Sequence, residues 1–204
     1  MRIYFRALMV NVFILFSACN FFAQTTEKTL DGFWGMKFGS SIAECKRIIL
    51  SKEGAVLDTK HSTENKLIVD GAEFGGRKTA FIALLFTDNK LHTAKVYFVP
   101  RLESKVFELY DEIKSEINDK YYVTKNDYRL FKYPYEDGDG YETQAIKLGK
   151  ASIASFWSFP RSDGHKNSIS LEINETLIVI LSYQDGLLIE EAIEKQKSKT
   201  SKDY

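Results

Sequence analysis

The sequence predicts an α+β fold in which an antiparallel sheet carries helices on one face. Three observations lead to this prediction: a β-hairpin at residues 79–98, amphipathic helical stretches at residues 42–53 and 102–118, and several short β-rich segments after each helix. Runs of strands after a helix favour antiparallel meanders, whereas a parallel sheet needs strands and helices to alternate. Because the order recurs, we expect either one domain or two tandem halves at residues 33–99 and 100–196.

Composition supports a globular domain. Of the 204 residues, 44% are hydrophobic and 14% aromatic, enough to bury a core. Lys and Arg number 28, as do Asp and Glu. Non-specific binding of nucleic acid needs an excess of basic residues, so this balance argues against a nucleic-acid partner.

Residues 1–23 have the features of an export signal. Arg2 and Arg6 precede an apolar stretch at residues 7–18. This stretch is shorter than the roughly 20 residues that span a bilayer. We therefore expect an exported protein that is periplasmic, held at the outer membrane, or secreted.

Two alternatives exist for processing of this signal. Cleavage after Ala23, a small residue, would release an exported domain at residues 24–196. Leu15-Phe-Ser-Ala-Cys19 instead resembles a bacterial lipobox, in which Cys19 becomes lipidated, although Phe16 stands where that pattern prefers Leu. The small residue before the cut favours the first alternative. Either way only Cys45 remains as a thiol, which rules out an intramolecular disulfide.

The first helix has clear boundaries. Polar residues at 24–31 predict an extended or mobile leader before it. Ser41 and Glu44 fit a capping box, and Gly54 fits a helix stop. Cys45 lies on the apolar stripe of this helix, so it is expected to be a small core residue and not a nucleophile.

The strands that follow are defined by turn residues. Strands are expected at residues 55–59 and 66–70, with Gly75-Gly76 breaking the chain before the hairpin. Asp88-Asn89-Lys90 tolerates the tight turn that a hairpin needs. The first arm of the hairpin is apolar on both faces, so something should pack over it.

The second half repeats this order. After the helix at 102–118, the pattern predicts strands at residues 121–133, 141–148 and 151–159, a hairpin at 168–181, a short helix at 187–195 and a disordered tail at 197–204.

The opening of the mature chain resembles a known fold. Gly35-Met36 before a Ser-capped helix that ends at Gly54, followed by an antiparallel meander, resembles the β-lactamase-inhibitor-protein-like fold, shared with small outer-membrane assembly lipoproteins. Phe74-Gly75-Gly76 leading into residues 86–91 is similar to uncharacterised secreted proteins of the Bacteroidetes type. The likeness covers residues 33–98, and the proline that usually follows the helix-ending glycine is absent. It implies binding of another protein through a sheet face or loops.

Aromatic residues are concentrated between residues 121 and 141. If the strand continues to Tyr135, then Phe131, Tyr133 and Tyr135 share one face. Such a face would suit the capture of a protein or peptide, although cross-strand pairing inside an ordinary sheet predicts the same residues. The candidate partner-binding residues are Tyr128, Phe131, Tyr133, Tyr135 and Tyr141.

No motif predicts catalysis, a metal or a cofactor. His61, His92 and His165 are far apart in sequence and lack metal-ligand spacing. Glu136, Asp137 and Asp139 resemble part of a calcium loop, but a solvated turn explains them without a metal.

The leading hypothesis is therefore a non-catalytic binding or assembly module in the envelope or outside the cell. One alternative is an enzyme acting on envelope polymers, with His61, Asp137, Asp139 and His165 as its ionisable groups. Another is a structural lipoprotein anchored through Cys19. None of these hypotheses needs a cofactor.

Overall fold

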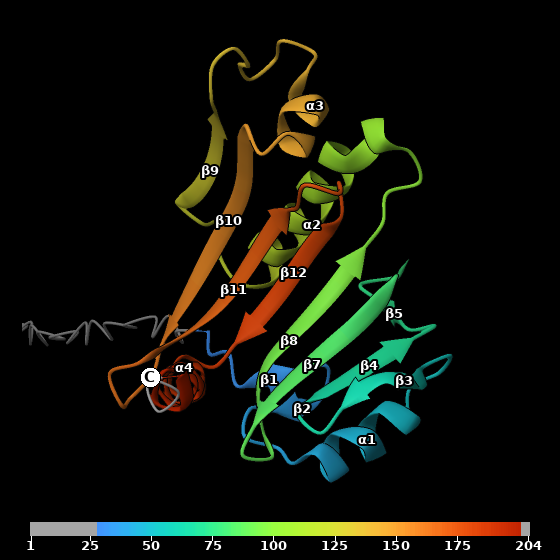
Figure 1. The fold of residues 1–204 in the computed structure, drawn as a ribbon, viewed down its shortest axis with the longest axis vertical. Helices are drawn as coiled ribbons and strands as arrows, with labels where there is room; N and C mark the ends of the chain where they lie inside the picture. Colours follow the sequence, from blue (N-terminus) through green and yellow to red (C-terminus); the bar gives the residue numbers. More distant parts are fainter. Residues whose placement is uncertain (1–27, 201–204) are drawn as a thin grey trace, which may run out of the picture.

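The computed structural model describes residues 28–200 and confirms an α+β fold built on one large antiparallel sheet (Figure 1). Eight strands pair in the order β3-β4-β7-β8-β12-β11-β10-β9. Their bounds are β3 Val56–Thr63, β4 Lys66–Asp70, β7 Phe81–Thr87, β8 Lys90–Phe98, β9 Asn126–Phe131, β10 Ala151–Pro160, β11 Lys166–Ile173 and β12 Val179–Gln184. Two small ribbons complete the strands: β1 Gly32–Phe33 with β2 Met36–Lys37, and β5 Glu73–Phe74 with β6 Arg77–Lys78.

The sheet consists of two four-stranded meanders joined side by side. Strands β3, β4, β7 and β8 follow helix α1 (Ile42–Leu50), and strands β9 to β12 follow helix α2 (Val106–Lys120), which a 3-10 turn, η1 (Glu103–Lys105), precedes. The meanders meet where β8 pairs with β12, from Phe98 opposite Val179 to Thr93 opposite Gln184. The two halves therefore share one sheet and one hydrophobic core.

Helix α1 begins at the predicted capping box. The Ser41 N–H donates to Glu44 Oε2 at 2.8 Å, and the Glu44 N–H donates to Ser41 Oγ at 3.3 Å. The Ile42 N–H donates to Asn89 Oδ1 in the β7–β8 turn. This last contact fixes the start of α1 against the central hairpin.

The predicted hairpin is confirmed as β7 and β8. Asp88 and Asn89 both have positive φ, 51° and 60°, as a two-residue turn between twisted strands requires. A register shift separates Leu85 and Phe86. Alternate residues of β7 lie on the two faces of the sheet, and those on one face lie under the helices.

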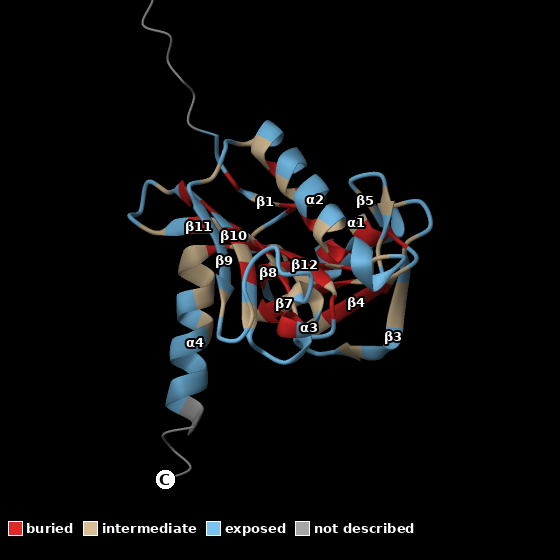
Figure 2. Cartoon of the chain, turned by 90° about the horizontal axis from the view of Figure 1, so that it is seen from above, coloured by how far each residue is buried: buried red, intermediate tan, exposed pale blue. Residues whose placement is uncertain are grey.

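Helices α1 and α2 lie on the same face of the sheet, and the core fills the space between (Figure 2). Helix α2 supplies Val106, Tyr110, Ile113 and Ile117 to this core. Trp157 on β10 is fully buried beneath α2, and its Nε1–H donates to Asn118 Oδ1 at 3.0 Å. One face of the sheet is thus sealed by helices.

Helix α4 (Gly186–Thr200) leaves the end of the sheet and projects from the body (Figures 1 and 2). Asp185 caps it, because Asp185 Oδ1 accepts from the Leu188 N–H at 2.9 Å. A Cβ on Gly186 would lie 2.1 Å from the Lys166 carbonyl oxygen, so only glycine fits there. The prediction of a disordered tail is wrong for residues 197–200, which continue α4, while residues 201–204 lie outside the described chain.

Three further expectations need correction or lie outside the description. Residues 142–147 form helix α3 (Glu142–Lys147) and not a strand; the adjacent Ala145 and Ile146 are both buried, whereas successive residues of a strand point to opposite faces. Of the two alternatives for the leader, extended or mobile, mobility is contradicted near its end, since Leu30 is buried and its carbonyl accepts from Asn167 Nδ2. The predicted export signal and Cys19 lie within residues 1–27, outside the described residues. Among the described helices, none is long and apolar enough to cross a membrane.

Candidate functional site

The sheet face turned away from α1 and α2 is the candidate site, and we call it the open face. Residues directly opposite each other in neighbouring strands point to the same face, so the pairing register defines its members. One row consists of Phe81, Tyr97, Ile180, Glu172, Ala154 and Tyr128. The next row consists of Ile68, Ala83, Lys95, Ser182, Ser170 and Phe156.

An aromatic pair lies over the first meander. Phe81 and Tyr97 are cross-strand partners whose rings stack with centroids 4.1 Å apart and planes 20° apart. Both rings are half-buried. Burial, and then the charge of Glu172, raises the pKa of Tyr97 above its usual value. The pair offers a flat apolar surface with one hydroxyl.

A second aromatic pair lies over the second meander. The rings of Tyr128 on β9 and Phe156 on β10 meet edge to face, with centroids 6.0 Å apart. Tyr128 is 45% exposed and Phe156 is 40% exposed, and Leu130 beside them is 60% exposed. Aromatic side chains this accessible on a sheet are typical anchors for a partner protein.

Between the two pairs, the open face carries small residues and two charges. The side chains between the pairs are short, because this part of the face is formed by Ser170, Ser182 and Ala154. The charged residues there are Lys95 and Glu172. Neither Lys95 nor Glu172 has an ion-pair partner among residues 28–200. The centre can therefore accept hydrogen bonds and charges from a ligand that lies across the strands.

The predicted aromatic residues do not form one surface. Strand β9 ends at Phe131, which is partly buried on the helix-covered face, so the expected shared face with Tyr133 and Tyr135 is wrong. Tyr133 is 93% exposed and precedes a cis proline, and Tyr141 begins α3. Of the five candidates, only Tyr128 lies on the open face.

Sequence reasoning missed Phe81, Tyr97 and Phe156. One sequence pattern could have indicated Phe81: the apolar residues of β7 occur at both odd and even positions, so apolar side chains lie on both faces of this strand. Only the pairing register brings Phe81 and Tyr128 to one surface, because four other strands lie between β7 and β9 in the sheet.

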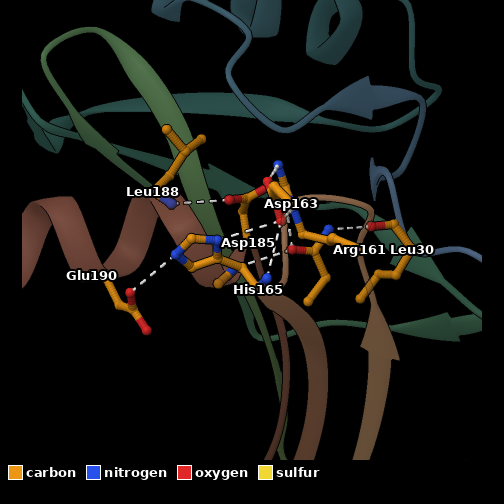
Figure 3. Close-up of polar contacts among 9 residues, drawn as sticks. Leu30, Arg161, Asp163, His165, Asp185, Leu188 and Glu190 are labelled. Atoms are coloured by element: carbon orange, nitrogen blue, oxygen red, sulfur yellow. Dashed lines mark hydrogen bonds and ion pairs between the residues drawn. The ribbon is translucent and has the colours of Figure 1, made fainter.

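A second polar cluster lies at the base of α4 (Figure 3). Arg161 bonds to the carboxylates of Asp185 and Asp163, and the Arg161–Asp185 contact is largely shielded by burial of Asp185. Asn167 receives the Gly186 N–H at 3.0 Å and donates to the Leu30 carbonyl. These bonds tie the β10–β11 turn, α4 and the N-terminal segment together.

His165 adds an imidazole to this cluster. Its Nε2 lies 3.3 Å from Glu190 Oε2, and its Nδ1 lies 3.4 Å from Asp163 Oδ1 without hydrogen-bond geometry. The guanidinium of Arg161 is the main reason that the pKa of Asp163 falls to about 2. A cavity of about 550 Å³ beside the cluster is lined by Arg161, Asn167 and Asp185 among others.

The remaining predicted groups have structural roles. Cys45 is fully buried and burial raises its pKa to about 11, which removes the thiolate needed for nucleophilic attack. His61 bonds to Asp58, while His92 is buried on β8 and burial lowers its pKa. The His92 carbonyl accepts from the Asp185 N–H at 3.0 Å, so His92 lies beside the cluster at the base of α4.

The acidic side chains that resembled part of a calcium loop bond to nearby protein groups. Asp139 accepts the Tyr141 N–H at 2.7 Å, and Asp137 forms a two-pronged pair with Arg129. Within residues 28–200, no three His, Cys, Asp or Glu side chains converge as metal ligands.

Comparison of the chain with protein-family models, curated proteins and solved structures gave no match.

Proposed function

We propose that this protein is an exported, non-catalytic module that holds a protein or peptide partner against the open face of its sheet, in the cell envelope or outside the cell. The observation that carries the proposal is the asymmetry of the sheet: two helices seal one face, and the other presents aromatic residues to solvent. The proposal that the protein is exported rests on the signal features of residues 1–23.

The chemistry of the open face supports a macromolecular partner. One aromatic pair lies over β7–β8 near the middle of the sheet and the other over β9–β10 at one edge, so a ligand that touches both must extend across β12 and β11. Aromatic residues are enriched at protein interfaces and often supply the anchoring contacts. The unpaired Lys95 and Glu172 would give such a partner its orientation.

Crosslinking in cells of the protein's own source tests the proposal. The mature chain from Gln24, tagged at its C-terminus, is crosslinked and its co-purifying proteins are identified. We expect one reproducible envelope or secreted partner whose capture falls at least about tenfold in the double variant Tyr128→Ala, Phe156→Ala, because interface anchors are each worth about 1–2 kcal/mol.

Two controls define the outcome. Leu102→Ala removes a side chain that is 64% exposed and lies outside the sheet, so it should leave capture unchanged. Tyr133→Ala and Tyr135→Ala test the loop that sequence reasoning had favoured. Capture that is lost in the loop variants and kept in the Tyr128, Phe156 double variant would exclude the open face.

The alternative is an enzyme that acts on envelope polymers. The observation in its favour is the imidazole of His165 beside two carboxylates and a cavity. His61, Asp137 and Asp139 do not join that cluster. Turnover of envelope polymers by the mature domain, abolished by His165→Gln, would support this alternative over the binding module.

The third candidate, a structural lipoprotein, depends on the N-terminus alone. Mass spectrometry of the processed chain distinguishes Gln24 as first residue from a lipidated Cys19. A lipidated terminus would anchor the chain to a membrane.

A further inference from the structure

The two edges of the sheet are built differently. At the β3 edge, the register shifts between Asp58 and Thr63, and Asp58 Oδ1 accepts the backbone N–H groups of Lys60 and His61. Helix α1 also contacts β3. A bulge and side chains that bond the edge backbone are common devices that prevent another strand from pairing there.

The β9 edge lacks these devices. Strand β9 pairs with β10 without a register shift, contains no proline, and has no further described strand beside it (Figure 1). Its residues from Asn126 to Leu130 are all exposed. An open, regular edge strand is a template for an added strand.

The pairing register shows which backbone groups are free. The Lys132 N–H donates to the Lys150 carbonyl at 2.7 Å, so these two residues form a hydrogen-bonded antiparallel pair. In such a ladder every second residue bonds to the neighbouring strand, so Leu130 and Tyr128 bond to β10. The N–H and C=O groups of Asp127, Arg129 and Phe131 point away from the sheet, and no described group bonds to them.

The side chains along this edge indicate the chemistry of a matching strand. Tyr128 and Leu130 present apolar surface on the open face. Lys132 and Lys150 follow them, are exposed, and have no ion-pair partner in the described chain. On the other face the Arg129–Asp137 pair occupies the space next to the edge, so we expect small side chains there.

We propose that β9 receives an extended segment of another protein as a ninth, antiparallel strand. The segment places apolar side chains opposite Leu130 and Tyr128, an acidic side chain opposite Lys132, and small residues at the intervening positions. This inference rests on the proposed function and specifies how its partner binds: main-chain bonds to Asp127, Arg129 and Phe131 supply the affinity, and alternate side chains extend onto the open face.

A synthetic peptide tests the proposal directly. The probe is a fluorophore-labelled Asp-Thr-Val-Thr-Tyr-Thr peptide with blocked ends, and the control is the same composition with the apolar residues adjacent, Val-Tyr-Thr-Thr-Thr-Asp. Fluorescence anisotropy with the mature protein should give a dissociation constant below about 1 mM for the probe, and no binding of the control. Failure of the probe to bind at that concentration overturns the proposal.

Hydrogen exchange locates the bound peptide. The amides of Arg129 and Phe131 should gain at least about tenfold protection, while those of Tyr128 and Leu130, already bonded to β10, should not change. Binding without protection of Arg129 and Phe131 contradicts strand addition. Protection that appears without peptide and rises with protein concentration identifies a second copy of this chain as the occupant, which also overturns the proposal.

A matched pair of variants isolates the backbone contribution. Arg129→Pro removes an outward N–H that β10 does not use, and Arg129→Ala removes the same side chain but keeps that N–H. We expect peptide binding to fall at least about tenfold in Arg129→Pro and to persist in Arg129→Ala. Unchanged protection of the Tyr128 amide shows that β9 remains folded.

The same variants separate this inference from the proposed function. If cellular capture is lost in the Tyr128, Phe156 double variant and kept in Arg129→Pro, the open face binds its partner and strand addition is wrong. If the wild-type chain captures nothing, the proposed function itself fails.

Discussion

The two faces of the sheet differ most clearly at two neighbouring aromatic residues of β10. Trp157 is fully buried beneath α2, and its indole N–H donates to Asn118 Oδ1 and to the Tyr122 carbonyl, both at 3.0 Å. Phe156 points the other way and is 40% exposed. Successive side chains of a strand alternate between faces, so aromatic content alone does not separate a core from a binding surface.

The charged side chains also differ between the helix-covered face and the open face. On the helix-covered face, Asp127 accepts from Lys114 Nζ at 2.9 Å and from Ser155 Oγ at 2.7 Å. On the open face, Lys95 and Glu172 have no described ion-pair partner. A face that serves stability pairs its polar groups internally, whereas a face that serves binding leaves them available.

The largest expected effect distinguishes Trp157 from its neighbour Phe156 on β10. Trp157→Ala should lower the free energy of unfolding by about 3–5 kcal/mol because it opens a large cavity and removes the indole N–H that donates to Asn118 and Tyr122. Phe156→Ala should lower it by less than about 1 kcal/mol. Urea unfolding of both variants measures the difference. Equal losses would show that the open face is part of the folding core.

A smaller effect is expected from removing one hydroxyl on each face. Tyr110 on α2 is buried, and its hydroxyl lies 2.6 Å from Ser155 Oγ. Tyr110→Phe should therefore cost about 1–2 kcal/mol of unfolding free energy. Tyr97 on the open face has no described hydrogen bond at its hydroxyl, so Tyr97→Phe should stay within about 0.5 kcal/mol. A comparable loss for Tyr97→Phe in urea unfolding would indicate an internal partner for that hydroxyl.

The smallest expected effect is a difference between wild type and Asp127→Asn in how stability depends on pH. Burial of Asp127 opposes ionisation, but hydrogen bonds from Ser155 and Lys114 outweigh it and hold the pKa below the usual 3.8. A lowered folded-state pKa stabilises the protein above the unfolded-state value, and this stabilisation disappears as the pH falls through the folded-state pKa. Asp127→Asn should thus be destabilising at pH 7, and the difference from wild type should shrink below about pH 4.

Melting temperatures between about pH 2 and pH 7 check this expectation. Glu172→Gln on the open face is the control, since Glu172 forms no ion pair within residues 28–200. A pH-independent effect of Asp127→Asn would mean that Asp127 acts through packing and not through its charge.

Sequence patterns predicted the elements that depend on local chemistry. The capping box at Ser41 and Glu44, the hairpin turn at Asp88 and Asn89, and the burial of Cys45 all follow from neighbouring residues, and the structure confirms them. The patterns were wrong at residues 141–148, where a six-residue helix is too short for its periodicity to be distinguished from a strand.

The sequence alone determined the fold class and its turns and caps, because these depend on residues within a few positions of each other. It also carries the signal features on which the export proposal rests. Only the tertiary structure decided that the two meanders join at β8 and β12, and that Phe81 and Tyr128 lie on one face. Those facts depend on register between strands far apart in the chain, and a one-residue slip would turn every side chain to the opposite face.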